Sequence, residues 1–153
     1  MYITCKKDTA IQFSNAQNAD YHLDVHSDAG AYATGCSGLY VSEAGKAFIT
    51  PITQAIMDIT PWSDVGVRKR TDLGVLNQTF AIAGLIELSF HDNTKEYTWM
   101  QSNGDLIAET LKNGIYKALN IEGITNYKIK YELLLNQYYS FRQGVVDVIN
   151  KFI

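Results

Sequence analysis

Hydrophobic and polar residues follow two different periods along this chain. In residues 21–26 they alternate, which predicts a strand with one polar face. Residues 81–90 are apolar at all but two positions, as expected of a strand that is covered on both sides. Apolar residues recur at helical spacing in 43–60 and 105–119, and residues 9–18 are polar and compatible with a helix. Strands that alternate with helices predict an α/β layer fold.

Shorter elements are predicted from local signals. Residues 2–5 and 39–41 are candidates for short strands. Residues 30–38 are expected to form a loop, and the charged stretch 62–79 is expected to be a surface loop.

Pro51 lies inside the helical pattern of residues 43–60. Proline has no N–H to donate and its ring crowds the preceding turn. It should therefore either kink this helix or start it, with Thr50 as the N-cap and Pro51 at the first helical position.

The end of the chain carries a different pattern. Apolar residues recur at spacings of four and three, as a heptad stripe of nearly four repeats, at Tyr127, Tyr131, Leu134, Tyr138, Phe141, Val145, Val148 and Phe152. We interpret residues 122–153 as an amphipathic helical extension or linker that follows a domain in residues 1–121. The stripe fits a long helix packed on this domain or its neighbour, and it also fits a homodimer through residues 127–152. Gly144 weakens both versions, and residues 127–133 would also alternate as a strand.

Length and composition narrow the class of protein. A chain of 153 residues, 46% of them hydrophobic, suits one domain with a core of its own. The formal charge of −3 and the lack of a basic block argue against a nucleic-acid partner. No apolar run approaches the roughly 20 residues that span a membrane, and the first residues do not look like a secretory signal. We therefore expect a soluble protein made in the cytoplasm, with Cys5 and Cys36 as free thiols.

Glu87 and His26 are the candidate site residues. Glu87 places one carboxylate in an apolar strand, where an uncompensated charge is costly to bury. His26 ends a strand with a polar face, although a single histidine in that position is more often a hydrogen-bonded structural residue. A histidine and a glutamate at strand ends point to a metal hydrolase, in which zinc polarises a carbonyl and a carboxylate acts as general base.

His22 and His26 are not expected to bind one zinc ion together. Four residues along a strand correspond to about 13 Å at roughly 3.3 Å per residue, whereas two nitrogens on one zinc ion lie within about 4 Å of each other. Asp24 or Asp28 would be closer companions for His26. His91 could approach from the loop after the Glu87 strand, although a capping or surface role is the simpler interpretation.

Four blocks resemble, in order and spacing, the zinc-dependent N-acetylmuramoyl-L-alanine amidases that cut bacterial peptidoglycan. Residues 20–29 are similar to the segment in which a histidine after a strand binds zinc. Residues 66–68 and 73–79 are similar to the family's glycine-valine and leucine-valine-leucine stretch. Residues 83–93 resemble the strand with the catalytic glutamate. Their ending Phe-His-Asp-Asn, with Trp99 six residues on, is like the version in clostridial and phage endolysins.

This resemblance covers roughly residues 2–121 and implies both a fold and an activity. The implied fold is α/β, with a mixed, mostly parallel sheet flanked by helices. The implied function is a peptidoglycan hydrolase of the bacterial cell wall that cleaves the amide between N-acetylmuramic acid and L-alanine, with Zn²⁺ as cofactor. By the same resemblance, His26 is a zinc ligand and Glu87 is the catalytic general base.

The chain also departs from the family. Family members open with a strand, a glycine-flanked histidine that is the first zinc ligand, and a helix that supplies a glutamate ligand, and none of these precedes the matching blocks here. We therefore expect an N-terminally truncated amidase fold, a gap in the sheet where the opening strand is missing, and an incomplete zinc site. Asn77 stands where many members have arginine, and Ile82 where many have proline.

Two accounts fit these departures. The chain is either part of a longer working amidase or a degenerate prophage remnant whose fold has been partly rebuilt. The alternative function is a catalytically inactive amidase remnant that acts as a binding or assembly module. A metallopeptidase that acts on proteins is disfavoured, because no HExxH motif is present.

Overall fold

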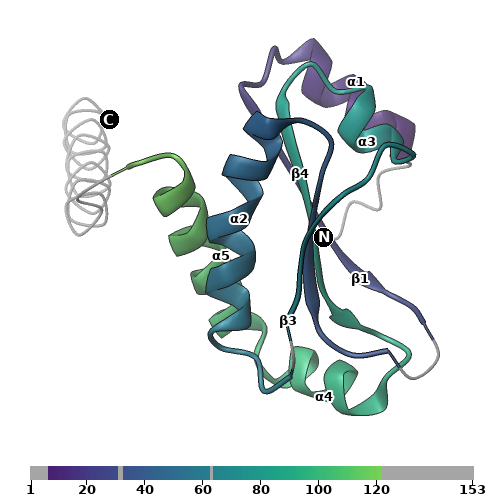
Figure 1. The fold of residues 1–153 in the computed structure, drawn as a ribbon, viewed down its shortest axis with the longest axis vertical. Coiled ribbons are helices and arrows are strands. Elements are labelled where there is room, and N and C mark those ends of the chain that lie inside the picture. The colour runs from purple at the N-terminus through teal and green to yellow at the C-terminus, as the bar shows by residue number, and fades with distance from the viewer. Residues whose placement is uncertain (1–6, 31–32, 63, 122–153) are drawn as a thin grey trace, which may run out of the picture. The chain divides into compact units, whose positions relative to one another are not determined.

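The computed structural model describes residues 7–30, 33–62 and 64–121. Within these ranges, helices and strands alternate along the chain (Figure 1). The strands are β1 (Tyr21–Asp28), β2 (Cys36–Tyr40), β3 (Asp64–Lys69) and β4 (Ile82–Phe90). The helices are α1 (Lys7–Ala16), α2 (Glu43–Met57), α3 (Gly74–Asn77), α4 (Thr94–Ser102) and α5 (Gly104–Ala118).

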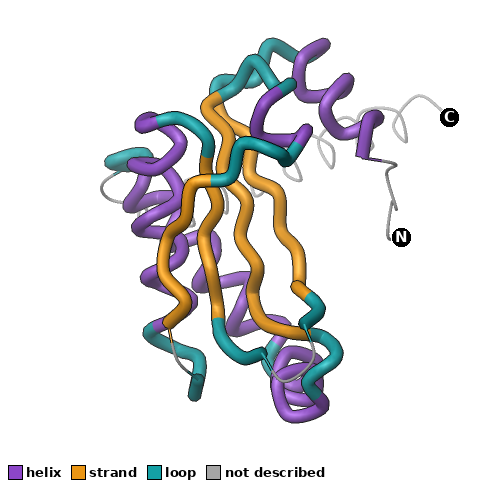
Figure 2. The backbone as a smooth tube through the Cα atoms, turned by 45° about the vertical axis from the view of Figure 1, so that its right-hand side comes forward, coloured by secondary structure: helices purple, strands orange, loops and turns teal. Residues whose placement is uncertain are grey.

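The described strands form one continuous mixed sheet in the order β1-β4-β2-β3 (Figure 2). β1 pairs with β4 and β2 pairs with β3 in parallel, and β2 pairs with β4 antiparallel. The predicted α/β fold with a mixed, mostly parallel sheet is thus confirmed. The expected gap between neighbouring strands is wrong for the described part of the sheet, because each strand is hydrogen-bonded directly to the next.

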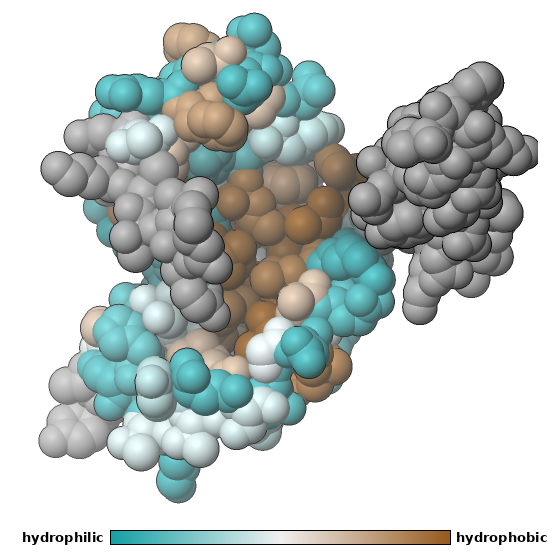
Figure 3. Space-filling model, turned by 180° about the vertical axis from the view of Figure 1, so that it is seen from behind, coloured by the Kyte–Doolittle hydropathy of each residue, from teal (hydrophilic) through white to brown (hydrophobic). Residues whose placement is uncertain are grey.

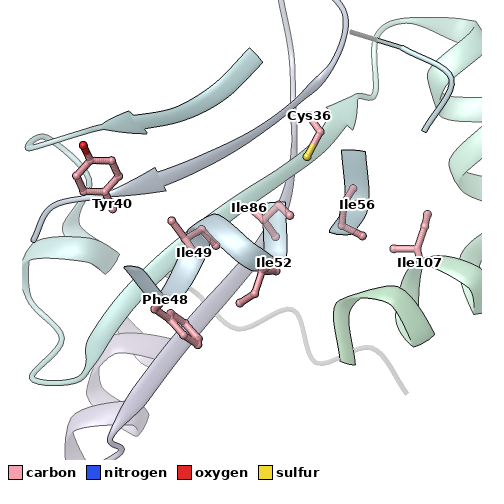
Figure 4. Close-up of a cluster of buried hydrophobic side chains, with 8 residues drawn as sticks. All are labelled: Cys36, Tyr40, Phe48, Ile49, Ile52, Ile56, Ile86 and Ile107. Carbon is pink, nitrogen blue, oxygen red and sulfur yellow. The ribbon is translucent and has the colours of Figure 1, made fainter. Parts of the chain in front are cut away.

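One face of the sheet packs against α2, and the main apolar core lies between them (Figures 1 and 4). Residues on β2 and β4 that point to this side meet the apolar face of α2, and α5 packs on α2 from outside. The predicted helical stripe of residues 105–119 is confirmed by these contacts. The buried members of the cluster are Cys36, Tyr40, Phe48, Ile49, Ile52, Ile56, Ile86 and Ile107.

The other face of the sheet is covered only in part. The short helix α3 and the preceding α1 lie over one end of it, and their side chains form a second apolar cluster with the strands (Figure 1). Its buried members are Ile11, Leu39, Val75, Leu76, Ala83 and Leu85. At the opposite end of the sheet, α4 follows β4 and contacts it.

β1 is an edge strand of the described sheet. Two of its apolar side chains, Tyr21 and Val25, are each 43% exposed, and the Tyr21 ring lies 5.0 Å from the ring of Phe48 on α2.

Figure 3 shows apolar residues gathered in a hollow on the side of the molecule that faces away from the viewer in Figure 1.

The long elements follow the sequence prediction closely. The helix in residues 9–18 and the strands in 21–26 and 81–90 are confirmed as α1, β1 and β4. The prediction of a loop up to residue 38 is wrong, because β2 begins at Cys36. The prediction of an irregular stretch at 62–79 is also wrong, because it contains β3 and α3.

Pro51 neither starts α2 nor ends it. The helix begins at Glu43, after the N-cap Ser42, whose side chain accepts a hydrogen bond from the backbone N–H of Gly45, and it continues through Pro51 to Met57. The proposed start at Thr50 is therefore wrong, and the Thr50 hydroxyl instead donates to the carbonyl of Lys46.

By its internal packing the chain divides into Met1–Asn120 and Ile121–Ile153. The predicted strand at 2–5, Cys5, the helical extension at 122–153 and the homodimer through 127–152 lie outside the described residues and remain predictions. Cys36 is fully buried, as expected for a small apolar thiol. In the described part of the chain, none of the helices has the length and apolar character that a bilayer crossing requires.

Candidate active site

The partly covered face of the sheet changes from apolar to polar along each central strand. On β4, Ala83 and Leu85 are buried under α1 and α3, and Glu87 is the next residue on that face. On β2, Leu39 belongs to the same apolar cluster, and Ser37 is its polar neighbour on that face. The apolar residues fix this end of the sheet, and the polar residues beyond them form the floor of the candidate site.

His26 and Glu87 are brought together by the strand register. His26 on β1 lies opposite Glu87 on β4, and Ser37 on β2 lies opposite Glu87 on its other side. Paired residues on neighbouring strands point to the same face and are about 5 Å apart. The two residues predicted from the sequence are therefore adjacent, and Ser37 joins them as a residue that the sequence analysis did not select.

The cost of burying the Glu87 carboxyl group is offset only in part by its neighbours. Its Oε2 atom is buried and has no hydrogen-bond partner among the described residues. Burial raises the pKa of Glu87, and the neighbouring carboxylates of Asp28 and Asp24 raise it further. His26 and His91 act in the opposite direction, but the net shift is upward. A carboxyl group with a raised pKa is suited both to accept and to return a proton near neutral pH.

His26 has a carboxylate partner on its own strand. Its Nε2 atom lies 3.1 Å from Oδ2 of Asp24, and the His26 side chain is 49% exposed. This confirms Asp24 as a close companion of His26. His22 lies opposite Ala83, far along β1 from Glu87, and its buried Nε2 atom has no partner in the described part of the chain.

A register shift follows His26 on β1. Asp28 pairs with Phe90 where a regular ladder would pair it with Ser89. Asp28 lies close enough to the site to raise the pKa of Glu87. His91 lies just beyond, with Nδ1 3.1 Å from the hydroxyl of Ser27, so it has the surface role that was the simpler interpretation.

Glu96 is a second buried carboxylate, and the sequence analysis missed it. It is 1% exposed, and it accepts hydrogen bonds from the hydroxyl of Thr34 and from the backbone N–H groups of Gly35 and Phe90. These bonds join the loop before β2 to the end of β4 and to α4. Glu96 is thus fully engaged in structure, whereas Glu87 retains an unpartnered oxygen atom.

Two arginines on β3 and just after it carry positive charge along this side of the sheet. Arg68 is exposed, and its Nη2 atom donates to the hydroxyl of Ser37 at 3.2 Å. Arg70 instead forms a paired contact with Asp72, with Nε and Nη2 at 2.8 and 2.7 Å from the two carboxylate oxygens.

The described residues supply only part of a zinc site. A catalytic zinc ion needs three protein ligands and an open position. His26 and a neighbouring carboxylate are adjacent, but residues 7–30, 33–62 and 64–121 contain no group of three or more histidine, cysteine, aspartate or glutamate residues that could hold a metal ion. The zinc site thus stays a prediction, of which these residues supply His26 and its neighbouring carboxylates.

Comparisons with known proteins place these observations in a family. The family model described as N-acetylmuramoyl-L-alanine amidase matches residues 2–117. A comparison with curated proteins found no match.

Three solved structures illustrate the likeness in fold. The catalytic domain of CwlV, an N-acetylmuramoyl-L-alanine amidase from Bacillus (Paenibacillus) polymyxa var. colistinus, matches with a TM-score of 0.70 and 20% identity, over 77% of this chain and 68% of that one. An N-acetylmuramoyl-L-alanine amidase from Clostridium difficile 630 matches with a TM-score of 0.68 and 21% identity, over 78% and 68%. The catalytic domain of the CD27L endolysin, which targets Clostridia difficile, matches with a TM-score of 0.66 and 26% identity, over 72% and 62%.

Proposed function

This chain belongs to the N-acetylmuramoyl-L-alanine amidase family of peptidoglycan hydrolases, and from that premise we propose that Glu87 is its catalytic general base and acid. The observation that carries the proposal is the half-buried Glu87 carboxyl group, which has an unpartnered oxygen and a raised pKa and lies between the half-exposed His26 and the buried Ser37. In the same proposal, the macromolecular partner is peptidoglycan and the place of action is the bacterial cell wall.

Amide hydrolysis requires two proton transfers, and one carboxyl group can perform both. The Glu87 carboxylate takes a proton from the attacking water as the oxygen–carbon bond forms at the carbonyl. It returns that proton to the nitrogen as the carbon–nitrogen bond breaks, which leaves a lactyl carboxylic acid and the free amine of L-alanine. The raised pKa of Glu87 makes its carboxylate a stronger base for the first transfer and helps it to keep the proton until the nitrogen accepts it.

The family depends on zinc, which supplies a Lewis acid for the carbonyl and lowers the pKa of water when it is bound. We propose that His26 contributes one zinc ligand, since it is adjacent to Glu87 and about half of its side chain is exposed. Asp24 would orient His26, as carboxylates commonly do for ligating histidines. The remaining ligands would have to come from outside the described residues, and metal affinity should be low without them.

The proposed role of Glu87 is tested by a substitution that removes its ability to accept and donate a proton but keeps the size of the side chain. Glu87→Gln should reduce release of L-alanine amino groups from purified peptidoglycan by about 100-fold or more, which is the usual contribution of a general base. The control is Glu109→Gln, which removes an exposed carboxylate paired with Lys112 on α5. Circular dichroism should show that both variants fold. Turnover by Glu87→Gln at the wild-type rate would reject the assigned role.

A second candidate function is a binding or assembly module without catalysis. It is favoured by the absence of a three-ligand metal group in the described residues, and the heptad stripe at 127–152 would join the chain to a partner or to a second copy. Zinc content after mild purification separates the two functions. Stoichiometric zinc that is lost in His26→Ala, together with amine release, supports the hydrolase. A metal-free dimer that leaves peptidoglycan intact supports the module.

A further inference from the structure

Arg68 is placed to act on the same substrate as Glu87. Arg68 and Ser37 point to the same face of the sheet, because Gly66, two residues before Arg68, lies opposite Ser37. The hydrogen bond from Arg68 to the Ser37 hydroxyl holds the guanidinium group over β2. Ser37 in turn lies opposite Glu87. The guanidinium group is therefore about one strand spacing away from the strand that carries Glu87.

The guanidinium group of Arg68 has further N–H donors besides the one that contacts Ser37. An arginine presents five N–H donors in a planar fork, and the contact with Ser37 uses Nη2. Among the described residues, the ion pairs join Asp24 to His26, Asp72 to Arg70 and Glu109 to Lys112, and none of them involves Arg68. Arg70 shows the contrast, because both of its contacts with Asp72 are already made.

The rest of the site floor is negative. Asp24, Asp28 and Glu87 lie close enough for both aspartates to raise the pKa of Glu87. An anionic substrate would be repelled by this group of carboxylates unless a cation met its charge nearby. Arg68 provides such a cation on the side of Glu87 away from β1, where the two aspartates lie.

We propose that Arg68 binds a carboxylate of the peptidoglycan stem peptide, one or two residues beyond the amide that is cleaved. This inference rests on the proposed function, in which Glu87 acts at that amide. An extended peptide covers about 3.5 Å per residue, and neighbouring strands are about 4.8 Å apart. A side-chain or terminal carboxylate at that distance from the reacting amide meets the Arg68 fork, which matches carboxylate geometry with two parallel hydrogen bonds. Arg68 thus makes the enzyme selective for the acidic over the amidated stem.

The experiment measures binding, so that it does not depend on turnover. The probes are an N-acetylmuramoyl tripeptide with free carboxylates and the same tripeptide with its carboxylates amidated, each titrated into the full chain by calorimetry. Wild-type protein should bind the acidic form about tenfold more tightly, as expected for a charge-assisted pair. In Arg68→Met this preference should fall below about twofold, and in Arg68→Lys it should be intermediate, because lysine keeps the charge and loses the fork.

Lys69→Met is the matched control, because Lys69 is the next residue on β3 and points to the opposite face. It removes the same charge and should keep the full preference for the acidic tripeptide. Equal binding of both tripeptides by wild-type protein, or a preference that persists in Arg68→Met, would overturn the assignment of Arg68. If the preference depends on Arg68 but Glu87→Gln retains full turnover, the proposed role of Glu87 fails and the Arg68 contact stands.

Discussion

Replacement of Glu96 by glutamine should destabilise the fold strongly, although the two side chains have nearly the same size. The Glu96 carboxylate is 1% exposed and accepts from Thr34 and Gly35 at one oxygen and from Phe90 at the other. A glutamine amide has only one acceptor oxygen. In either orientation, its NH₂ group would face at least one buried N–H or O–H donor that has lost its acceptor.

The size of the effect follows from these three bonds. A buried donor that loses its partner costs about 1–3 kcal/mol, and a hydrogen bond weakens when its acceptor is no longer charged. We therefore expect Glu96→Gln to lower the free energy of unfolding by about 3 kcal/mol, out of a total that is typically about 5–15 kcal/mol. For a domain of this size, that corresponds to a decrease in Tm of about 6–12 °C.

Urea unfolding followed by tryptophan fluorescence measures this change. The probe is suitable because the rings of Trp62 and Trp99 meet edge to face at 5.0 Å, next to the elements that Glu96 joins. Glu109→Gln is the control, since it removes an exposed carboxylate and should change stability by no more than about 0.5 kcal/mol. A Glu96→Gln variant that unfolds at the same urea concentration as this control would refute the reasoning.

Three further predictions test the site, the core and the sheet edge. The pKa of Glu87 in the folded protein is raised above its ordinary value of 4.5, so the folded state favours the protonated carboxyl group. The stability that the protonated group provides is complete below pH 4.5 and is lost as the pH rises through the folded pKa. The free energy of unfolding of Glu87→Gln minus that of wild type should therefore increase with pH over that window, and a flat difference in urea titrations would contradict the shift. In α5, a Cβ at Gly114 would lie 2.9 Å from Cα of Ile52, whereas a Cβ at Gly104 meets nothing within 4 Å. Gly114→Ala should cost about 1–2 kcal/mol and Gly104→Ala almost nothing, so equal thermal stability would show that α2 and α5 pack less closely. Val25→Lys places a charge on the exposed edge strand and should raise the concentration at which light scattering detects association, and identical association of both proteins would show that this edge is not involved.

The elements that could be predicted from the sequence are those with a strong period. β4, α2 and α5 bury long apolar surfaces, so their patterns extend over many residues. β3 was missed because it is a short strand at the edge of the described sheet, with a glycine of positive φ at Gly66 and basic residues at its end. Charged side chains on an edge strand hinder its pairing with other chains, and they also remove the apolar pattern by which a strand is recognised in the sequence.

The candidate site was predicted in part for a similar reason. Glu87 stood out as a charge in an apolar strand, and the family resemblance supplied His26. Ser37 and Arg68 could not be selected, because what makes them neighbours of Glu87 is the register of three strands that are distant in sequence. Glu96 had a weak signal, since Asn93 lies three residues before it in the spacing of a capping box. Its carboxylate turned out to bind the backbone of Phe90.

The division of one sheet face into an apolar and a polar part has a consequence for evolution. The side chains that hold α1 and α3 in place and those that surround Glu87 occupy successive positions on the same strands, yet the apolar cluster under the two helices contains neither Glu87 nor its paired neighbours His26 and Ser37. Substitutions among the polar residues should therefore leave the packing of α1 and α3 on the sheet intact. A lineage of proteins with this architecture can lose its catalytic activity, or acquire a different one, while natural selection continues to maintain the fold.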